Sequence, residues 1–228
     1  MPEASTPTVR RRPARRGDGD RLREEIVEAA GRLLNDTGDP STLSLRAVAR
    51  EVGVATTSIY LHFEDLTALV RAVKMRWLDQ LAEQVEAAAA AASGDPIERV
   101  HAVAHAYVAA GMSAPNRYRV LFTAELSPGT PADLPFLGVS AFDAAHAQLK
   151  HAVPERVDTY LLTIQLWCGM HGLVTLRQAR PNFPWPDLDA QVNDLVDRFV
   201  LTTQPCTASE AARAATRTGS QTGENGGA

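Results

Sequence analysis

The sequence predicts an all-α protein in which a small N-terminal group of helices is followed by a larger helical domain. Between residues 20 and 204, apolar residues recur three and four positions apart, which is the spacing of an amphipathic helix. Proline and glycine interrupt this spacing at intervals, as they do between helices. No segment keeps the apolar and polar alternation that is typical of a β-strand.

The composition is that of a globular protein. The chain has 228 residues, of which 45% are hydrophobic and 22% charged, and this is enough to bury a core. No apolar run approaches the roughly 18 residues that cross a bilayer, and no apolar stretch follows the basic N-terminus as in a signal peptide. We therefore expect a cytoplasmic protein without a membrane partner. Cys168 and Cys206 match no metal or redox spacing, which predicts reduced thiols.

The two ends of the chain predict disorder. Residues 1–19 are rich in Pro, Gly, Ser and Arg, and residues 205–228 in Thr, Ser, Gly and Ala, so neither segment buries enough apolar surface to fold. The net charge of −4 argues against a chain that coats nucleic acid. The N-terminal segment is nevertheless locally basic and forms a candidate arm, with a tail that has no role as the alternative. Its arginines are Arg10, Arg11, Arg12, Arg15 and Arg16.

The first three helices are predicted before residue 64. Asp20 is placed to cap the first helix and Gly38 to end it. Ser44 can cap a short second helix that stops at Gly53. The apolar spacing resumes at once and predicts another short helix packed across the second, so the three form a helix-turn-helix domain.

Longer helices are predicted over the rest of the chain. One begins near Leu66 and runs to Gly94, where Asp95-Pro96-Ile97-Glu98 has the cap, the proline and the glutamate of a new helix start. We place the helix-turn-helix domain at residues 20–78 and the larger helical domain at residues 79–204. The further helices predicted in the larger domain are 97–112, 116–125, 136–151, 155–179 and 187–202.

A run of hydroxyl residues stands at the start of the third helix. In a helix-turn-helix, the second helix of the motif lies in the major groove of DNA with its first residues against the base edges. Ala55 and the run Thr56, Thr57 and Ser58 occupy this position. Short hydroxyl and methyl groups allow close approach, hydrogen bonds and contacts with thymine methyls. The alternative is that the run only caps its own helix.

The segments LSLRAVAREVGV and IYLHF, the latter followed by LTALV, carry a resemblance to a known family. Residues 21–73 resemble the N-terminal DNA-binding domain of the tetracycline-repressor (TetR) family. The resemblance implies that Arg46, Tyr60 and His62 contact the DNA backbone. Together with the start of the third helix, the candidate DNA-binding residues are Ser44, Arg46, Ala55, Thr56, Thr57, Ser58, Tyr60 and His62.

One position departs from the family pattern. Many relatives have a lysine at the start of the fourth helix, whereas this chain has Leu66, preceded by Glu64 and Asp65. A phosphate contact is therefore in doubt at this position. The amides at the start of that helix, or the arginine arm, would have to supply the attraction, and the arm could enter the minor groove.

For residues 79–204 the resemblance implies a ligand-binding and dimerisation domain. The segment LWCGMHGLVTL, residues 166–176, resembles a subgroup with a Trp-x-x-x-His-Gly signature. The same resemblance implies that the helices near 155–179 and 187–202 pair with their copies in a homodimer. The candidate interface residues lie on apolar stripes that burial within one subunit explains equally well. They are Leu162, Leu166, Leu173, Leu176, Leu195 and Phe199.

A pocket for an unidentified small-molecule effector would be lined by apolar and aromatic side chains with a few polar ones. His101 and His105 have the spacing of a helical metal pair, with Glu98 nearby, but the sequence offers no fourth ligand, so we expect no metal and no cofactor. The pocket candidates, each of which ordinary core packing also explains, are Tyr107, Met112, Tyr118, Phe122, Phe142, Trp167, Cys168 and His171.

These features predict a ligand-responsive, DNA-binding transcription regulator. We expect a repressor that binds a palindromic double-stranded operator as a homodimer and is released by a small apolar or amphipathic effector. One alternative is an all-helical enzyme with a vestigial DNA-binding domain, but residues 79–204 show no nucleophile, base and acid set and we assign no catalytic residue. Another is a constitutive DNA-binding protein without an effector.

Overall fold

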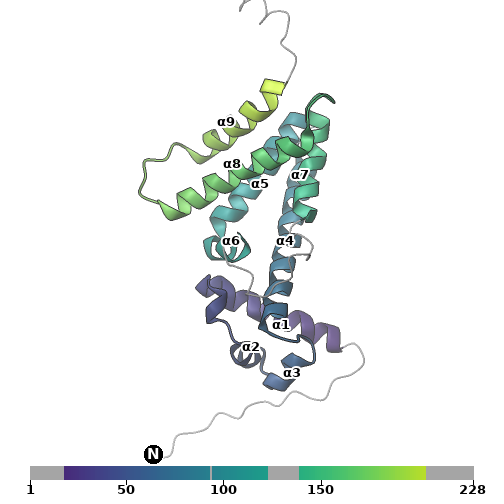
Figure 1. Cartoon of the computed structure of the whole chain (residues 1–228), viewed down its shortest axis with the longest axis vertical. Helices are drawn as coiled ribbons and strands as arrows, with labels where there is room; N and C mark the ends of the chain where they lie inside the picture. The colour runs from purple at the N-terminus through teal and green to yellow at the C-terminus, as the bar shows by residue number, and fades with distance from the viewer. Residues whose placement is uncertain (1–17, 93, 123–138, 204–228) are drawn as a thin grey trace, which may run out of the picture.

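The computed structural model describes residues 18–92, 94–122 and 139–203, and all regular structure within these ranges is helical. The first three helices lie together at one end of the molecule, and α9 lies at the other end (Figure 1). The long helix α4 connects the two groups. The helices are α1 (Asp18–Thr37), α2 (Leu45–Val52), α3 (Thr56–Tyr60), α4 (Leu66–Ala91), α5 (Pro96–Ser113), α6 (Pro115–Phe122), α7 (Val139–Ala152), α8 (Thr159–Ala179) and α9 (Leu188–Val200).

Short-range signals set the ends of several helices as the sequence predicts. Ser44 caps α2 by accepting a hydrogen bond from the Ala47 amide, and Asp95 caps α5 in the same way. Gly38 and Gly53 follow α1 and α2 with φ of 64° and 79°, in the left-handed region where a glycine has no steric penalty.

Two of the predicted helix starts are wrong. The first helix begins at Asp18, so Asp20 lies inside α1 and does not cap it. The helix predicted from residue 155 begins at Thr159, because the side chain of Asp158 accepts a hydrogen bond from the Leu161 amide, 3.0 Å away. A carboxylate in this position satisfies an amide that has no partner within the helix, and it marks the true start.

The N-terminal core is built by α1 to α4. The side chains of Ile26, Leu34, Val48, Ile59 and Leu69 are fully buried there. This core fixes the angle between α2 and α3, since each short helix contributes one of the fully buried side chains. Two helices of eight and five residues would not be stable alone and depend on this packing.

The second core lies between α4, α5, α7, α8 and α9. Ala104, Val174, Val192 and Val196 are fully buried in it. The boundary that we predict between residues 78 and 79 falls inside α4, which contributes Trp77 to the N-terminal core and residues further along to the second core. The two domains therefore share a continuous helix of 26 residues. None of the helices in the described ranges has the length and apolar character that crossing a membrane requires.

Helix α6 also belongs to both cores. Its Val120 is fully buried among the side chains of the N-terminal core, whereas Tyr118 is buried in the second core. Positions two apart on a helix point in nearly opposite directions, so the eight residues of α6 lie between the domains as a wedge. A movement of α6 would disturb the packing on both sides.

Candidate DNA-binding surface and effector cavity

Helix α3 presents its first residues to solvent. Ile59 and Phe63 anchor it in the core, while Thr57 is exposed and Thr56 and Ser58 are half-buried. The helix begins after Ala55 without a side-chain cap, so the hydroxyl run does not cap its own helix. The run therefore has its hydroxyl groups available to an external partner, which favours the groove-facing interpretation.

Two large side chains extend this surface at the end of α3. Tyr60 is 57% exposed and Leu61 is 82% exposed, while His62 is half-buried in the following turn. Leu61 is not among the candidates predicted from the sequence. Its exposure could have been predicted, because Leu61 is two positions from both Ile59 and Phe63 and so points away from the buried face that they share. An apolar side chain this exposed, beside a candidate backbone contact, suits a thymine methyl or a deoxyribose.

Helix α2 lies at the same end of the molecule (Figure 1). Ser44 caps this helix and Arg46 lies in its first turn. The Oγ atom of Ser44 accepts from the Ala47 amide at 3.2 Å, and its own hydrogen stays available for a phosphate oxygen. Arg46 is exposed. Glu51, the acidic residue of α2, is paired with Arg32 at 3.2 Å, which offsets its repulsion of DNA.

At the start of α4, fewer backbone amides are available to a DNA phosphate than we expect from the sequence. Asp65 accepts a hydrogen bond from the Ala68 amide at 2.7 Å, so this amide is already bonded to a carboxylate of the chain itself. The expectation that the amides at this helix start attract a phosphate is wrong for Ala68. Attraction to the backbone must come from elsewhere, and the arginine arm that we predict lies outside the described residues.

An apolar cavity lies among α4, α5, α6, α7 and α8. Four of the predicted pocket residues line it, namely Tyr107, Phe122, Phe142 and Trp167. None of the lining side chains carries a charge, so the cavity suits an apolar molecule or the apolar part of a larger one. The remaining lining residues are Leu78, Leu81, Val85, Val100, Val103, Ala141, Ala145, Leu149, Thr163, Leu166 and Met170.

A chain of hydrogen bonds runs along one wall of this cavity. The Trp167 Nε1 donates to the Tyr107 hydroxyl at 3.0 Å, the hydroxyls of Tyr107 and Tyr118 are 2.8 Å apart, and the Tyr118 hydroxyl is 2.7 Å from Nδ1 of His171. An indole nitrogen only donates, so every donor has a partner when Tyr107 donates to Tyr118 and Tyr118 donates to His171. In the opposite order, the Tyr107 hydrogen is left without a partner among the described residues.

This order requires His171 to be neutral, with Nδ1 as the acceptor. Burial lowers the pKa of His171 below its usual value of 6.5, which favours the neutral ring. Burial also raises the pKa of Tyr107 and of Tyr118, so both hydroxyls keep their hydrogens. Because Tyr118 belongs to α6, these hydrogen bonds connect the cavity to the helix that lies between the domains.

Acidification is expected to destabilise the fold through His171. A histidine whose pKa is lowered by folding binds its proton more readily when unfolded, so the free energy of unfolding falls as the pH drops below about 6.5 and levels off below the folded pKa. Each unit of difference between the two pKa values is worth about 1.4 kcal/mol. Urea unfolding at pH 7.5 and 5.5 measures the loss, which should be smaller in His171→Gln.

The same comparison with His151→Gln, an exposed position on α7, is the control. His146 also has a pKa lowered by burial, but its contribution is common to all three proteins and cancels in the comparison. An identical loss of stability in the wild type and in His171→Gln would remove His171 from the buried network.

The remaining pocket candidates lie outside the cavity lining. Tyr118 and His171 take part through the hydrogen bonds described above. Met112 is half-buried and packs against the second core. Cys168 is exposed, because it follows Trp167 by one position and so points away from the cavity side of α8. The structure therefore does not support Cys168 as a pocket residue.

The outer face of α8 differs from the predicted dimer stripe. Leu162 and Leu166 are buried inside the subunit, and Leu166 lines the cavity, so neither is available to a second copy. Leu176 of the predicted stripe is exposed, at 55%, and Leu161, which lies outside that stripe, is 50% exposed. The other predicted interface residues, Leu173, Leu195 and Phe199, are half-buried.

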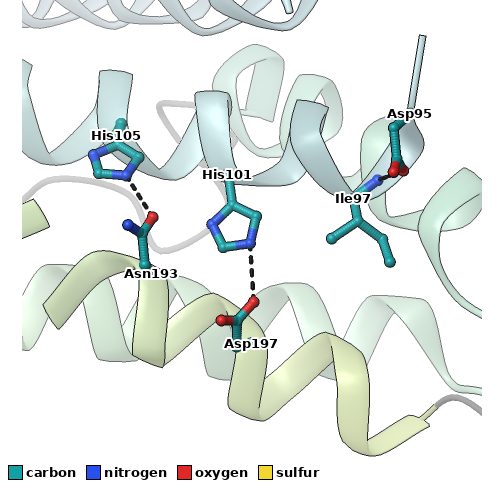
Figure 2. Close-up of polar contacts among 6 residues, drawn as sticks. All are labelled: Asp95, Ile97, His101, His105, Asn193 and Asp197. Atoms are coloured by element: carbon teal, nitrogen blue, oxygen red, sulfur yellow. Dashed lines mark hydrogen bonds and ion pairs between the residues drawn. The ribbon is translucent and has the colours of Figure 1, made fainter. Parts of the chain in front are cut away.

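His101 and His105 join α5 to α9 (Figure 2). The Nε2 atom of His101 is 3.0 Å from a carboxylate oxygen of Asp197, and Nε2 of His105 is 2.8 Å from the amide oxygen of Asn193. The two histidines therefore hold neighbouring helices together. Within the described ranges, no three His, Cys, Asp or Glu side chains converge as a metal site would require.

Two family models match the chain, and together they cover about two thirds of it. Residues 26–73 match the model described as bacterial regulatory proteins, tetR family. Residues 100–203 match the tetracyclin repressor-like, C-terminal domain. The first match contains α2, α3 and most of α1, and the second contains the effector cavity except for its α4 wall.

Individual relatives agree with these matches. An uncharacterized HTH-type transcriptional regulator of Mycobacterium tuberculosis is 28% identical over 177 residues, which cover 78% of this chain and 79% of that protein. A protein of unknown function from Rhodococcus sp. RHA1 has a similar solved structure, with a TM-score of 0.69 and 24% identity, over 80% of this chain and 96% of that one.

A third relative has been solved with a ligand. The transcriptional regulator FadR of Bacillus subtilis, in complex with stearoyl-CoA, has a TM-score of 0.64 and 17% identity, over 78% of this chain and 97% of that one. At this identity the likeness establishes the shared fold. The fold, with its helix-turn-helix end and its larger helical domain, is therefore common to these proteins and this chain.

Proposed function

Since the chain belongs to the TetR family of bacterial regulatory proteins, we propose that it is a repressor whose affinity for DNA is controlled by a ligand bound in the apolar cavity. The chain is a DNA-binding transcription regulator. In our proposal, two copies bind a palindromic operator in the cytoplasm, with α3 of each copy in the major groove. A small apolar or amphipathic effector enters the cavity and releases the DNA, and catalysis has no part in this function.

The observation that carries the proposal is the position of α6. Tyr118 of α6 is bonded to Tyr107, which lines the cavity, while Val120 of the same helix is buried in the core that holds α3. An effector that displaces Tyr107 therefore acts on α6 and, through it, on the DNA-binding core. Two sites are coupled when both bias one element with two arrangements, and α6 is such an element in our proposal.

Helix α6 is also clamped to the end of α1. The Arg119 Nε donates to the carbonyl of Gly38 at 3.0 Å, and its Nη2 donates to the carbonyl of Thr37 at 3.1 Å. Asn116 donates to the carbonyl of Asn35 at 2.9 Å. These carbonyls have no partner within α1, and they attract a cation. A Cβ at Gly38 would collide with the Arg119 guanidinium, so the glycine allows the contact as well as the turn.

A palindromic operator has two half-sites, and a dimer supplies one recognition helix for each. Two recognition helices must reach half-sites about 34 to 36 Å apart, or a multiple of this. A small tilt of α1 and α3 changes that spacing and costs affinity. In our proposal the outer face of α8, with Leu161 and Leu176, pairs with its copy together with α9. The stearoyl-CoA bound by FadR, which has a long acyl chain on a charged head, supports the idea that this fold accommodates an amphipathic ligand.

The double variant Leu161→Asp with Leu176→Asp is expected to disrupt the dimer. Burying two carboxylates on each side of an apolar interface is unfavourable by several kcal/mol. Sedimentation at micromolar concentration should give a dimer for the wild type and a monomer for the variant. An operator selected from random double-stranded DNA should be palindromic, and the variant should bind it at least tenfold more weakly, since one half-site replaces two.

Val139→Asp is the matched control, because Val139 is 47% exposed and belongs to a different helix, α7. The control should remain dimeric. A double variant that sediments as a dimer would show that this face of α8 does not form the interface.

A further inference from the structure

A second cavity lies beside the apolar one at the junction of α4, α5 and α6. The two cavities are neighbours, because Leu81 and Tyr107 line both. The second is more polar, since Gln84, Ser113 and Arg117 contribute to its lining. Among the described side chains that line either cavity, only Arg117 carries a charge.

Arg117 is held in place by part of its hydrogen-bonding capacity. Its Nη2 donates to the carbonyl of Trp77 and to Oε1 of Gln80, both at 2.9 Å. Its guanidinium carbon lies 5.2 Å from the centre of a Trp77 ring. A guanidinium has five N–H groups, so those on Nε and Nη1 stay available. The side chain is therefore oriented by α4 while part of its donor edge is unused.

Among the described residues, no carboxylate balances the charge of Arg117. The guanidinium is half-buried, and burial lowers its pKa. Its neutral neighbours provide hydrogen bonds and ring contacts without an opposite charge. Burial of a cation without an anion is unfavourable, and a bound anion removes this cost.

The end of α5 and the start of α6 meet at the second cavity. Ser113 is the last residue of α5 and Ala114 is its C-cap, and both line the cavity directly before Pro115, the first residue of α6. The partial negative charge at the end of α5 opposes the partial positive charge at the start of α6, so the preference for an anion rests on Arg117. No acidic side chain of the described residues lines this space.

We propose that the effector is an amphipathic organic anion, with its acidic head at Arg117 in the second cavity and its apolar body in the first. The proposal rests on the proposed function, in which the first cavity holds the effector. A molecule that spans both spaces must pass Tyr107, the residue bonded to Tyr118 on α6. The apolar body of such an effector therefore contacts the residue through which the first cavity acts on α6.

Two fluorescent probes that differ only in an acidic group test this assignment. Both 8-anilinonaphthalene-1-sulfonate and its uncharged analogue N-phenyl-1-naphthylamine report entry into an apolar site, but only the first has an anionic head. In Arg117→Gln, the affinity for the sulfonate should fall about tenfold, the loss expected when one charge-assisted contact is removed. The affinity for the uncharged probe should stay within about twofold of the wild type.

Three further variants separate the anion site from other effects. Arg117→Lys keeps the charge and should lose less than Arg117→Gln. Ser113→Asp, at an exposed position on the cavity rim, opposes an anion without touching the Trp77 and Gln80 contacts, so it serves if Arg117→Gln does not fold. Arg180→Gln changes the net charge equally at an exposed site on the end of α8 and should alter neither affinity.

The contrary outcomes are distinct from one another. An unchanged sulfonate affinity in Arg117→Gln and Ser113→Asp overturns the anion site but leaves the apolar cavity as an effector site. Equal losses for both probes overturn it too, because they show that Arg117 only supports the fold. If neither probe binds the wild type, the effector cavity itself fails, and the proposed function fails with it.

Discussion

Replacing Thr57 and Tyr60 together by alanine is expected to lower the affinity for the operator by roughly 1,000-fold while leaving the fold intact. Thr57 lies exposed in the first turn of α3, and Tyr60 is 57% exposed at its end. Each side chain supplies one contact worth about 1 kcal/mol or more, and a dimer loses each contact twice. Fluorescence anisotropy with labelled operator DNA measures the loss.

The fold should survive because the anchors of α3 are untouched. Ile59 and Phe63 hold the helix in the core, and neither Thr57 nor Tyr60 is buried there. Thermal unfolding should therefore match the wild type within a few degrees. Met75→Ala removes another large exposed side chain from the same domain, on α4, and should bind DNA normally. Wild-type affinity in the double variant would show that α3 does not contact the operator.

The double variant Arg119→Ala with Asn116→Ala is expected to separate effector binding from DNA release. These side chains donate to the carbonyls at the end of α1. Without these hydrogen bonds, a movement of α6 is no longer transmitted to α1 and the DNA-binding core. Coupling between two sites is typically worth about 1 to 3 kcal/mol, or about 5- to 150-fold in affinity. In the variant, the effect of N-phenyl-1-naphthylamine on operator affinity should fall below about twofold, although the probe still binds.

Arg180→Ala is the control for this experiment, since it removes an arginine side chain from the far end of α8 and should leave the coupling unchanged. If the Arg119 and Asn116 variant responds to the probe as the wild type does, the signal does not travel through the contact between α1 and α6. The uncharged probe is used here because an anion would also compete with DNA through simple electrostatics.

Local sequence signals were sufficient for the DNA-binding end. Ser44, Gly53 and Ile59 act within a few positions of one another as cap, turn and anchor, and each does so in the structure. Such signals depend on the backbone and on nearest neighbours, so they can be read without the tertiary fold. The same is true of Asp95 at the start of α5.

The inner and outer faces of α8 could not be told apart in this way. The helix is apolar nearly all round, with Leu161 next to Leu162 and Leu173 near Leu176, so its periodicity does not say which stripe faces the core. The position of α5, α7 and α9 decides this, and their contacts with α8 connect residues far apart in the sequence. The assignment of Leu162 and Leu166 to the dimer interface failed for this reason.

The roles of α6 and Arg117 also depend on long-range contacts. Tyr118 and Val120 differ by two positions, and no local pattern indicates that they are buried in different domains. Arg117 stands between charged and polar residues and looks like part of a solvated surface in the sequence. Only the packing of α6 against α4 shows that its guanidinium is half-buried beside a cavity.

The central claim is that the cavity and the DNA-binding surface are coupled, and one titration tests it directly. The affinity of the wild-type protein for N-phenyl-1-naphthylamine is measured by fluorescence with and without a saturating amount of operator DNA. Coupling is reciprocal, so the operator should weaken the binding of the probe by the same factor by which the probe weakens the binding of the operator. Equal probe affinity in the presence and absence of the operator would contradict the account.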